Sequence, residues 1–296
     1  MPLIAIAGAT GTVGAKLTHQ LLAAGARVRV LSRNPEKAKA LFKGPNCEVV
    51  GVDFDTPGSL QRAFKGADRA FLCTGTSDRQ VRDEIALIDA AVHAGVPYLV
   101  SLSVGGAGGS AAGSSNVLAW HTEIDTHLAA QDVAFTLLRP ATFTDTLIRV
   151  ASKFVPKAAW GGTAEDGLIS AVDTRDVAAC AAAILLEGPE RHVKKIYTLT
   201  GPSPVTMDDV ALLLGNSLGT PVHYIRRSDE EQRALYLASG FPPLMVDVLL
   251  GLDDLTRNNV YARPAGDVLA LTAQAPRSMG AFVRERVGDF VMTAKS

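Results

Sequence analysis

The chain has 296 residues, a net charge of −1 and nearly equal numbers of acidic and basic side chains. This balance argues against a nucleic-acid-binding protein, which normally carries a basic face. Three cysteines, Cys47, Cys73 and Cys180, match no disulfide or metal-ligand spacing, so no metal is expected. No signal sequence precedes the first apolar run, and no run approaches the roughly 18 apolar residues of a membrane span, which predicts a soluble, cytoplasmic protein without a membrane partner.

The first 140 residues alternate between short apolar runs and helix-length stretches. This alternation predicts right-handed βαβ crossovers and therefore an α/β fold, a Rossmann-type doubly wound parallel sheet with helices on both faces. Runs such as 3–7 are apolar on both faces, as strands covered on both sides require. The predicted strands are 3–7, 27–31, 48–52, 69–73, 98–102 and 134–138, and the predicted helices are 13–24, 35–42, 59–64, 79–94 and 120–130.

After Pro140 the alternation becomes less regular. From Ser228 onward we expect only helices, broken by prolines, in a small and mostly helical C-terminal lobe. The sequence thus predicts a Rossmann domain over 1–155 and a smaller lobe over 156–296, from which 168–200 rejoin the main sheet. Between Pro140 and Ser228 we expect helices at 142–154, 173–186 and 206–218 and strands at 168–172 and 195–200.

The strongest local motif is the run GATGTVG, which follows the first predicted strand and opens a helix. Its first glycine permits a tight turn, the second lets the backbone approach a pyrophosphate, and the third lets the helix pack against the sheet. Free N–H groups at the helix start would face an anion. The alternative is a glycine-rich turn without a ligand. The predicted cofactor contacts of this loop are Gly8, Thr10, Gly11, Thr12, Val13 and Gly14.

A second cofactor signal stands at the end of the second predicted strand, where the chain has Ser32 and Arg33. Enzymes that prefer NAD usually place Asp or Glu there, to bind the ribose hydroxyls. A guanidinium can instead hold a 2′-phosphate with two charge-assisted hydrogen bonds. The sequence therefore favours NADP(H) over NAD(H). The alternative is that Arg33 is an ordinary solvated side chain.

A third segment, residues 105–115, consists of Gly, Ala and Ser throughout. It follows the fifth predicted strand, at the carboxyl edge of the sheet, where ligands bind in folds of this kind. A surface linker and a mobile active-site loop are both compatible with this composition.

Six stretches together resemble the NmrA-like group of atypical short-chain dehydrogenase/reductases, which includes quinone and triphenylmethane-dye reductases. They are GATGTVG, LSRNPEKA, GVDFDTPGSLQRAFKGADRAFL, HTEIDTHLAAQDVAFTLLRPATF, DTRDVAACAAAILL and IYTLTGPSPVTMDDVALLLG. Each contact that the resemblance implies also has a packing explanation; Cys73, for example, could be a small buried hydrophobe. The implied cofactor contacts are Asp53, Phe54, Cys73, Thr74, Gly75 and Ser101, and the implied nicotinamide or substrate contacts are Ser103, Thr142 and Phe143.

The chain departs from many short-chain reductases in the stretch AWHTEID. Those enzymes use a Tyr as the general acid and a Lys four residues later, but Trp120 and Ile124 occupy this spacing here. His121 aligns with a histidine of the dye and quinone reductases and is the candidate catalytic proton donor near pH 7. The alternative is a histidine near a helix start that is bonded to the backbone or solvent. Glu123 and Asp125 are interpreted as helix-terminal charges.

The missing Tyr and Lys limit the chemistry that the chain can perform. Reduction of an isolated ketone needs a positioned acid, whereas quinones and dye cations spread the incoming charge over a conjugated system. We therefore expect an NADPH-dependent reductase that acts on a quinone, a dye or a similar small-molecule conjugated acceptor. The alternative is a regulatory protein that binds NADP(H) as a redox sensor without turnover. A homodimer is compatible with either interpretation, and no nucleic-acid partner is expected.

Overall fold

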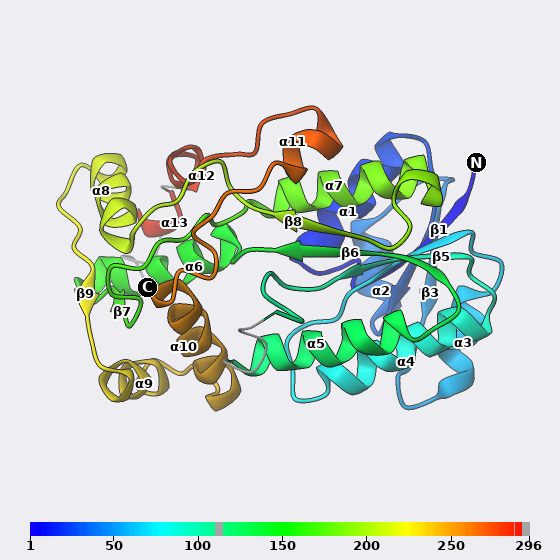
Figure 1. Cartoon of the computed structure of the whole chain (residues 1–296), viewed down its shortest axis with the longest axis horizontal. Coiled ribbons are helices and arrows are strands. Elements are labelled where there is room, and N and C mark those ends of the chain that lie inside the picture. Colours follow the sequence, from blue (N-terminus) through cyan, green and yellow to red (C-terminus); the bar gives the residue numbers. More distant parts are fainter. Residues whose placement is uncertain (110–114, 287, 292–296) are drawn as a thin grey trace.

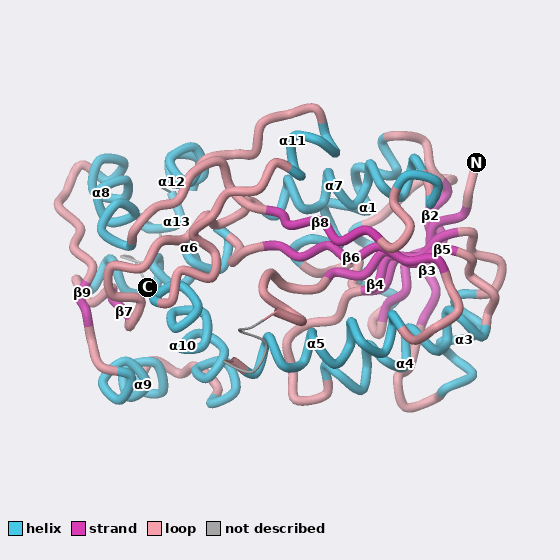
Figure 2. Tube along the Cα trace, viewed as in Figure 1, coloured by secondary structure: helices cyan, strands magenta, loops and turns pink. Residues whose placement is uncertain are grey.

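The computed structural model describes residues 1–109, 115–286 and 288–291. Its centre is a sheet of seven parallel strands in the order β3-β2-β1-β4-β5-β6-β8 (Figures 1 and 2). The order reverses between β1 and β4, which is the switch point where open sheets of this kind bind ligands. The strands are β1 (Leu3–Ala7), β2 (Arg27–Ser32), β3 (Cys47–Gly51), β4 (Arg69–Leu72), β5 (Tyr98–Leu102), β6 (Ala134–Pro140) and β8 (Lys195–Leu199).

Helices cover both faces of the sheet (Figure 1). In β1, Ile4 and Ile6 pack into one apolar core, and Ala5 and Ala7 pack into another. This alternation explains why the strand is apolar along its whole length. The first core includes residues of α1 (Thr12–Ala23), α2 (Pro35–Leu41) and α7 (Thr174–Glu187). The second includes residues of α3 (Pro57–Phe64), α4 (Gln80–His93) and α5 (Asn116–Ala129).

A separate apolar core lies beyond the carboxyl ends of β6 and β8 (Figure 1). A two-stranded sheet of β7 (Gly161–Gly162) and β9 (Ile225–Arg226) lies in the same region. None of the helices in the described ranges is long and apolar enough to cross a membrane. The start of α5 contributes Leu118 to this core, and α11 (Asp267–Thr272) contacts α7 and β8. The other helices that contribute to this core are α6 (Thr144–Phe154), α8 (Met207–Leu218), α9 (Asp229–Ala238), α10 (Pro243–Arg257), α12 (Met279–Arg286) and α13 (Gly288–Val291).

One expectation about this region, the strand at 168–172, was wrong. The predicted strand 168–172 forms only isolated bridges, from Val172 to Phe143 and from Ile169 to Val205. The backbone N–H of Ser170 donates to the carbonyl of Tyr261 at 2.8 Å, so this segment is held by the loop after α10. Of the stretch 168–200, residues 195–199 join the main sheet as β8. The lobe also contains the short strands β7 and β9, which the sequence did not predict and which both lie before Ser228; after Ser228 the described residues form helices and loops, as expected.

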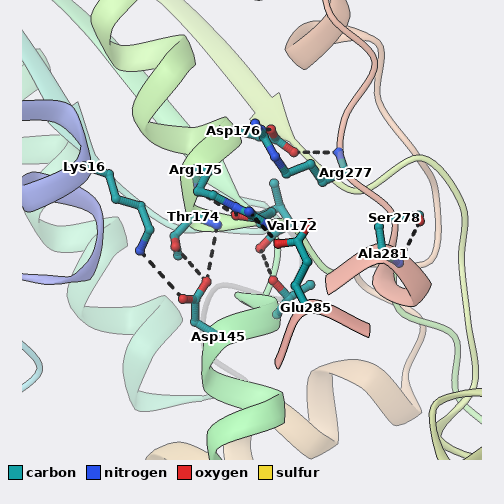
Figure 3. A network of polar contacts seen from close by, with 12 residues as sticks. Lys16, Asp145, Val172, Thr174, Arg175, Asp176, Arg277, Ser278, Ala281 and Glu285 are labelled. Carbon is teal, nitrogen blue, oxygen red and sulfur yellow. Dashed lines mark hydrogen bonds and ion pairs between the residues drawn. The ribbon is translucent and has the colours of Figure 1, made fainter. Parts of the chain in front are cut away.

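A network of polar contacts joins the lobe to the sheet domain (Figure 3). Asp145, in the first turn of α6, accepts a 2.7 Å hydrogen bond from the Thr174 hydroxyl and forms a 3.7 Å ion pair with Lys16 of α1. Arg175 of α7 forms a 2.6 Å ion pair with Glu285 of α12. Helices far apart in the sequence are therefore tied together beside the start of α1.

Candidate cofactor and substrate site

The glycine loop after β1 has no room for a side chain at Gly8 or Gly14. Gly8 has φ +74°, and a Cβ there would lie 2.6 Å from the carbonyl oxygen of Cys73, at the end of β4. A Cβ at Gly14 would overlap the carbonyl oxygen of Gly8. The N–H of Gly11 donates to that same carbonyl at 2.9 Å and closes the turn. The loop therefore brings bare backbone to the sheet edge at the point where the strand order reverses.

The start of α1 is open to a ligand. Gly11 is the N-cap residue, it provides no side-chain cap, and the first turn contains no acidic residue. Thr10, Gly11 and Thr12 are exposed, whereas the Val13 side chain is buried, so Val13 can offer only its backbone N–H. The first N–H groups of a helix have no partner within the helix and favour an anion. This cradle fits a pyrophosphate.

The end of β2 carries the residues predicted to contact the adenosine ribose. Ser32 is buried, and its hydroxyl donates to the Asn34 carbonyl at 2.9 Å and accepts from the Asn34 N–H at 3.1 Å. Arg33 is exposed at the same edge. The serine therefore shapes the turn, and the arginine side chain is open to a bound group.

The residues after β3 and β4 are largely engaged within the protein. The carboxylate of Asp53 accepts from the Asp55 N–H at 3.0 Å and from the Thr56 hydroxyl at 2.8 Å, and Phe54 packs against the core beneath α3. Burial raises the pKa of the Cys73 thiol far above its usual range, so it is not a nucleophile at neutral pH. At Gly75, by contrast, a Cβ would meet no atom within 4 Å.

Two pairs of polar residues face each other between α4 and α5. Gln80 and Glu84 are one turn apart on α4, as are His121 and Asp125 on α5. The Gln80 side-chain nitrogen lies 3.3 Å from Glu84 Oε1 and 3.1 Å from His121 Nε2. Because an amide nitrogen only donates, Nε2 is the acceptor, and the proton of the neutral ring is on Nδ1. Thr74 completes this cluster through a 2.8 Å hydrogen bond from its hydroxyl to Glu84.

Burial sets the charges of this cluster. Burial, together with the nearby charge of Arg139, lowers the pKa of His121 to about 4. Burial also raises the pKa of Glu84 to about 7, against the hydrogen bonds that it accepts from Thr74 and Gln80. His121 is therefore uncharged at neutral pH and does not carry the extra proton of an imidazolium acid.

The rest of the cluster comes from the ends of β5 and β6. The Ser103 hydroxyl donates to Asp125 at 2.8 Å, and Arg139 pairs with the same carboxylate at 2.8 Å. Ser101 is buried on β5. Among the described residues, Glu84 Oε2, His121 Nδ1 and Asp125 Oδ1 are buried without a hydrogen-bond partner.

Thr142 is not part of this cluster and lines a cavity in the C-terminal lobe. Its hydroxyl is buried and has no partner among the described residues. Phe143 instead packs against the core beneath α7 and is not part of the cavity wall. The cavity is lined by Thr142, Thr146, Leu147, Val150, Trp160, Gly161, Ile169, Met207, Tyr224, Tyr236, Leu249, Leu252, Asp253 and Thr256.

The glycine-rich segment after β5 is packed where it is described. The Tyr261 hydroxyl donates to the Gly105 carbonyl at 3.1 Å, and Gly105 and Ala107 are buried. Of the two interpretations left open for 105–115, the surface linker does not fit the buried residues Gly105 and Ala107, and residues 110–114 lie outside the described residues. In the described ranges, no group of three or more His, Cys, Asp or Glu side chains could hold a metal ion.

The strand order and the glycine cradle at its switch point define a dinucleotide-binding α/β protein. The model of a family of NAD(P)H-binding proteins matches residues 8–188, and the chain belongs to this family. The resemblance identified from the sequence motifs is thus confirmed.

Several characterised proteins are similar to the chain along nearly its whole length. It is 26% identical to an NAD(P)H azoreductase of Xenophilus azovorans over 97% of this chain and 99% of the relative. Its fold matches the NADPH-dependent quinone oxidoreductase QOR2 of Escherichia coli, solved with NADPH, with a TM-score of 0.88 and 25% identity, covering 95% of this chain and 99% of that one. The Citrobacter sp. triphenylmethane reductase solved with NADP(H) matches with a TM-score of 0.83 and 24% identity, covering the same shares.

Proposed function

We propose that the chain is an NADPH-dependent reductase that transfers hydride to a quinone, a dye or a similar conjugated acceptor. One observation carries this proposal. The glycine cradle follows β1, and the cavity residue Thr142 follows β6, a strand of the same parallel sheet. Since the carboxyl ends of parallel strands share one edge, the cradle and the cavity lie on the same side of the molecule. The similarity to an azoreductase and to quinone and dye reductases supports the choice of acceptor.

The roles of the binding residues follow from their positions. The first N–H groups of α1 would hold the pyrophosphate, and the glycines would let it approach the backbone. Arg33 would hold the 2′-phosphate that distinguishes NADPH from NADH. NADPH supplies the hydride when it is bound, and the protein orients the acceptor and excludes water.

His121 would act as a neutral hydrogen-bond donor through Nδ1 and not as a general acid. Its Nε2 is held by Gln80, its Nδ1 has no partner among the described residues, and its pKa is lowered. A neutral imidazole can polarise an acceptor oxygen without losing a proton. This role suits acceptors whose reduced forms are weak bases.

The absence of the Tyr–Lys pair is also compatible with a second candidate function. In this alternative the chain binds NADP(H) and reports redox state to a partner without turnover.

The cytoplasmic location, a homodimer and the division at residue 155 stay predictions.

The test uses purified protein with NADPH or NADH and a panel of 1,4-benzoquinone, a cationic triphenylmethane dye and an azo dye, followed by cofactor absorbance. We expect oxidation of NADPH, in preference to NADH, by at least one acceptor. Tight NADP binding without turnover of any acceptor would support the sensor function. Absence of both binding and turnover would contradict both candidates.

A further inference from the structure

The cavity in the C-terminal lobe contains an acidic group among aromatic and aliphatic side chains. It encloses about 500 Å³ of space, counting the part open to solvent. Trp160, Tyr224 and Tyr236 supply flat apolar surface, which suits a conjugated acceptor. Asp253 of α10 is the carboxylic acid in this wall.

Asp253 is fixed in position by one of its two oxygens. Oδ2 accepts a 2.9 Å hydrogen bond from the backbone N–H of Thr163. A Cβ at Gly162 would clash with both Asp253 Oδ2 and the Tyr224 hydroxyl oxygen. Both of these side chains therefore pack directly against the backbone of Gly162. The close packing of Asp253 and Tyr224 against residue 162 requires a glycine there, and the pairing of β7 with β9 holds this glycine in place.

The groups around Asp253 determine the pH range in which its carboxyl group is protonated. Burial raises the pKa of Asp253 to about 6, and Asp229 of α9 acts in the same direction. The Thr163 N–H and Arg257 of the same helix oppose this rise. Tyr224 and Tyr236 also face Asp253, and burial raises the pKa values of their hydroxyls far above neutral. Among the described residues of the wall, Asp253 is thus the group that can release a proton near neutral pH.

We propose that Asp253 is the proton donor to the acceptor when the acceptor is a quinone, an inference that rests on the proposed function. A quinone that receives a hydride from NADPH gains two electrons and becomes a hydroquinone monoanion. The O–H bond of the Asp253 carboxylic acid breaks, and a new O–H bond forms on the phenolate oxygen. Asp253 is left as a carboxylate and takes up a proton from water. A cationic triphenylmethane dye differs, because hydride addition at its central carbon gives a neutral product and requires no proton.

This difference between acceptors provides the test. The variant Asp253→Asn keeps the size of the side chain but has no acidic proton. We measure kcat with 1,4-benzoquinone and with a cationic triphenylmethane dye, at saturating NADPH, from pH 5.5 to 8. We expect the ratio of quinone to dye kcat to fall at least about tenfold, as for loss of a general acid. The decline of quinone turnover above about pH 6 in the unmodified protein should also disappear in the variant.

A matched control is Asp247→Asn, which makes the same change on the same helix. Asp247 is half-buried, with 39% of its side chain exposed, and pairs with Arg233 at 2.7 Å. This variant should leave the ratio unchanged. A second readout needs no cofactor: the part of the infrared carboxylic-acid C=O band that titrates near pH 6 should be lost in Asp253→Asn, whereas the part that titrates near pH 7, from Glu84, should remain.

The outcomes separate this inference from the proposed function. An equal loss with both acceptors, together with a lower melting temperature, would assign Asp253 a structural role and overturn the inference. An unchanged ratio would overturn it as well, while the reductase function would stand. If the unmodified protein reduces neither acceptor, the proposed function and this inference fall together.

Discussion

The side-chain nitrogen of Gln80 lies 3.1 Å from Nε2 of His121 and holds the ring with its proton on Nδ1. We therefore expect ¹⁵N NMR to show a neutral Nδ1–H tautomer of His121 from pH 8 down to about pH 5, since its pKa is about 4. Gln80→Leu should remove the preference for this tautomer. The exposed His223 provides an internal reference in the same spectra. A cationic His121 at pH 7 would contradict the assignment.

Glu84 should make the stability of the protein depend on pH. Its pKa is about 7 in the folded protein and 4.5 in the unfolded chain, so the folded state binds more protons between these values. The contribution of Glu84 to the free energy of unfolding is complete below pH 4.5 and is lost as the pH rises to 7. Glu84→Gln should remove this loss, and its stability relative to the unmodified protein should increase by up to about 3 kcal/mol over the range.

Urea denaturation at several pH values between 4.5 and 8 measures this difference. Glu123→Gln is the control, because Glu123 is exposed on α5. Parallel pH profiles for Glu84→Gln and the unmodified protein would show that Glu84 does not change its protonation in this range.

Gly14→Ala should damage the cofactor cradle. The added methyl group would overlap the Gly8 carbonyl oxygen, which is backbone and cannot rotate away. We expect NADP⁺ to bind at least about tenfold more weakly and the protein to lose about 1–3 kcal/mol of stability, from calorimetric titration and thermal melting. Gly266→Ala is the control, because a Cβ there meets no atom within 4 Å.

Arg33→Ala should change cofactor preference. Loss of charge-assisted hydrogen bonds to a 2′-phosphate should weaken NADPH about 10- to 100-fold and leave NADH nearly unaffected. Arg27→Ala removes an exposed arginine at the other end of β2 and should change neither affinity. Equal losses for both cofactors in Arg33→Ala would rule out the 2′-phosphate contact.

Asp176→Ala should loosen the C-terminal lobe. Asp176 is buried, accepts a 2.7 Å hydrogen bond from the Arg277 N–H and pairs with the Arg277 guanidinium (Figure 3). Removing it should cost about 3 kcal/mol of stability and speed proteolysis after α11. Glu285→Gln breaks a more exposed ion pair with Arg175 and should cost less than about 1 kcal/mol. Equal effects of the two variants would contradict this account.

The sequence predicted the main sheet because its strands are buried on both faces. The expected bounds of β1 and β5 agree with the structure, whereas β6 continues for two residues to Pro140. Helix α5 begins at Asn116, four residues before the expected start, because the Ser115 hydroxyl caps it. Residues 168–172 look like a strand, but their backbone groups find partners in distant loops. Such partners cannot be read from local periodicity.

In the candidate site, too, the residues within one local motif could be predicted from the sequence, whereas the residues brought together by tertiary packing could not. The glycine motif and Arg33 are visible in the sequence because their spacing follows from one strand–turn–helix unit. Gln80 and Glu84 had no motif, and their role depends on the packing of α4 against α5. Asp253 contacts Thr163, 90 residues earlier in the chain, so only the folded lobe shows that it is a cavity residue.

The close approach of Gly8 to the Cys73 carbonyl has a consequence for how cofactor choice can evolve. At this point the backbone of one loop packs against the backbone of another, and the pyrophosphate common to NAD and NADP would be bound by backbone atoms. The atoms that tell the two cofactors apart would meet Arg33, an exposed side chain outside the core. Substitution at that one position could therefore exchange one cofactor for the other without disturbing the fold.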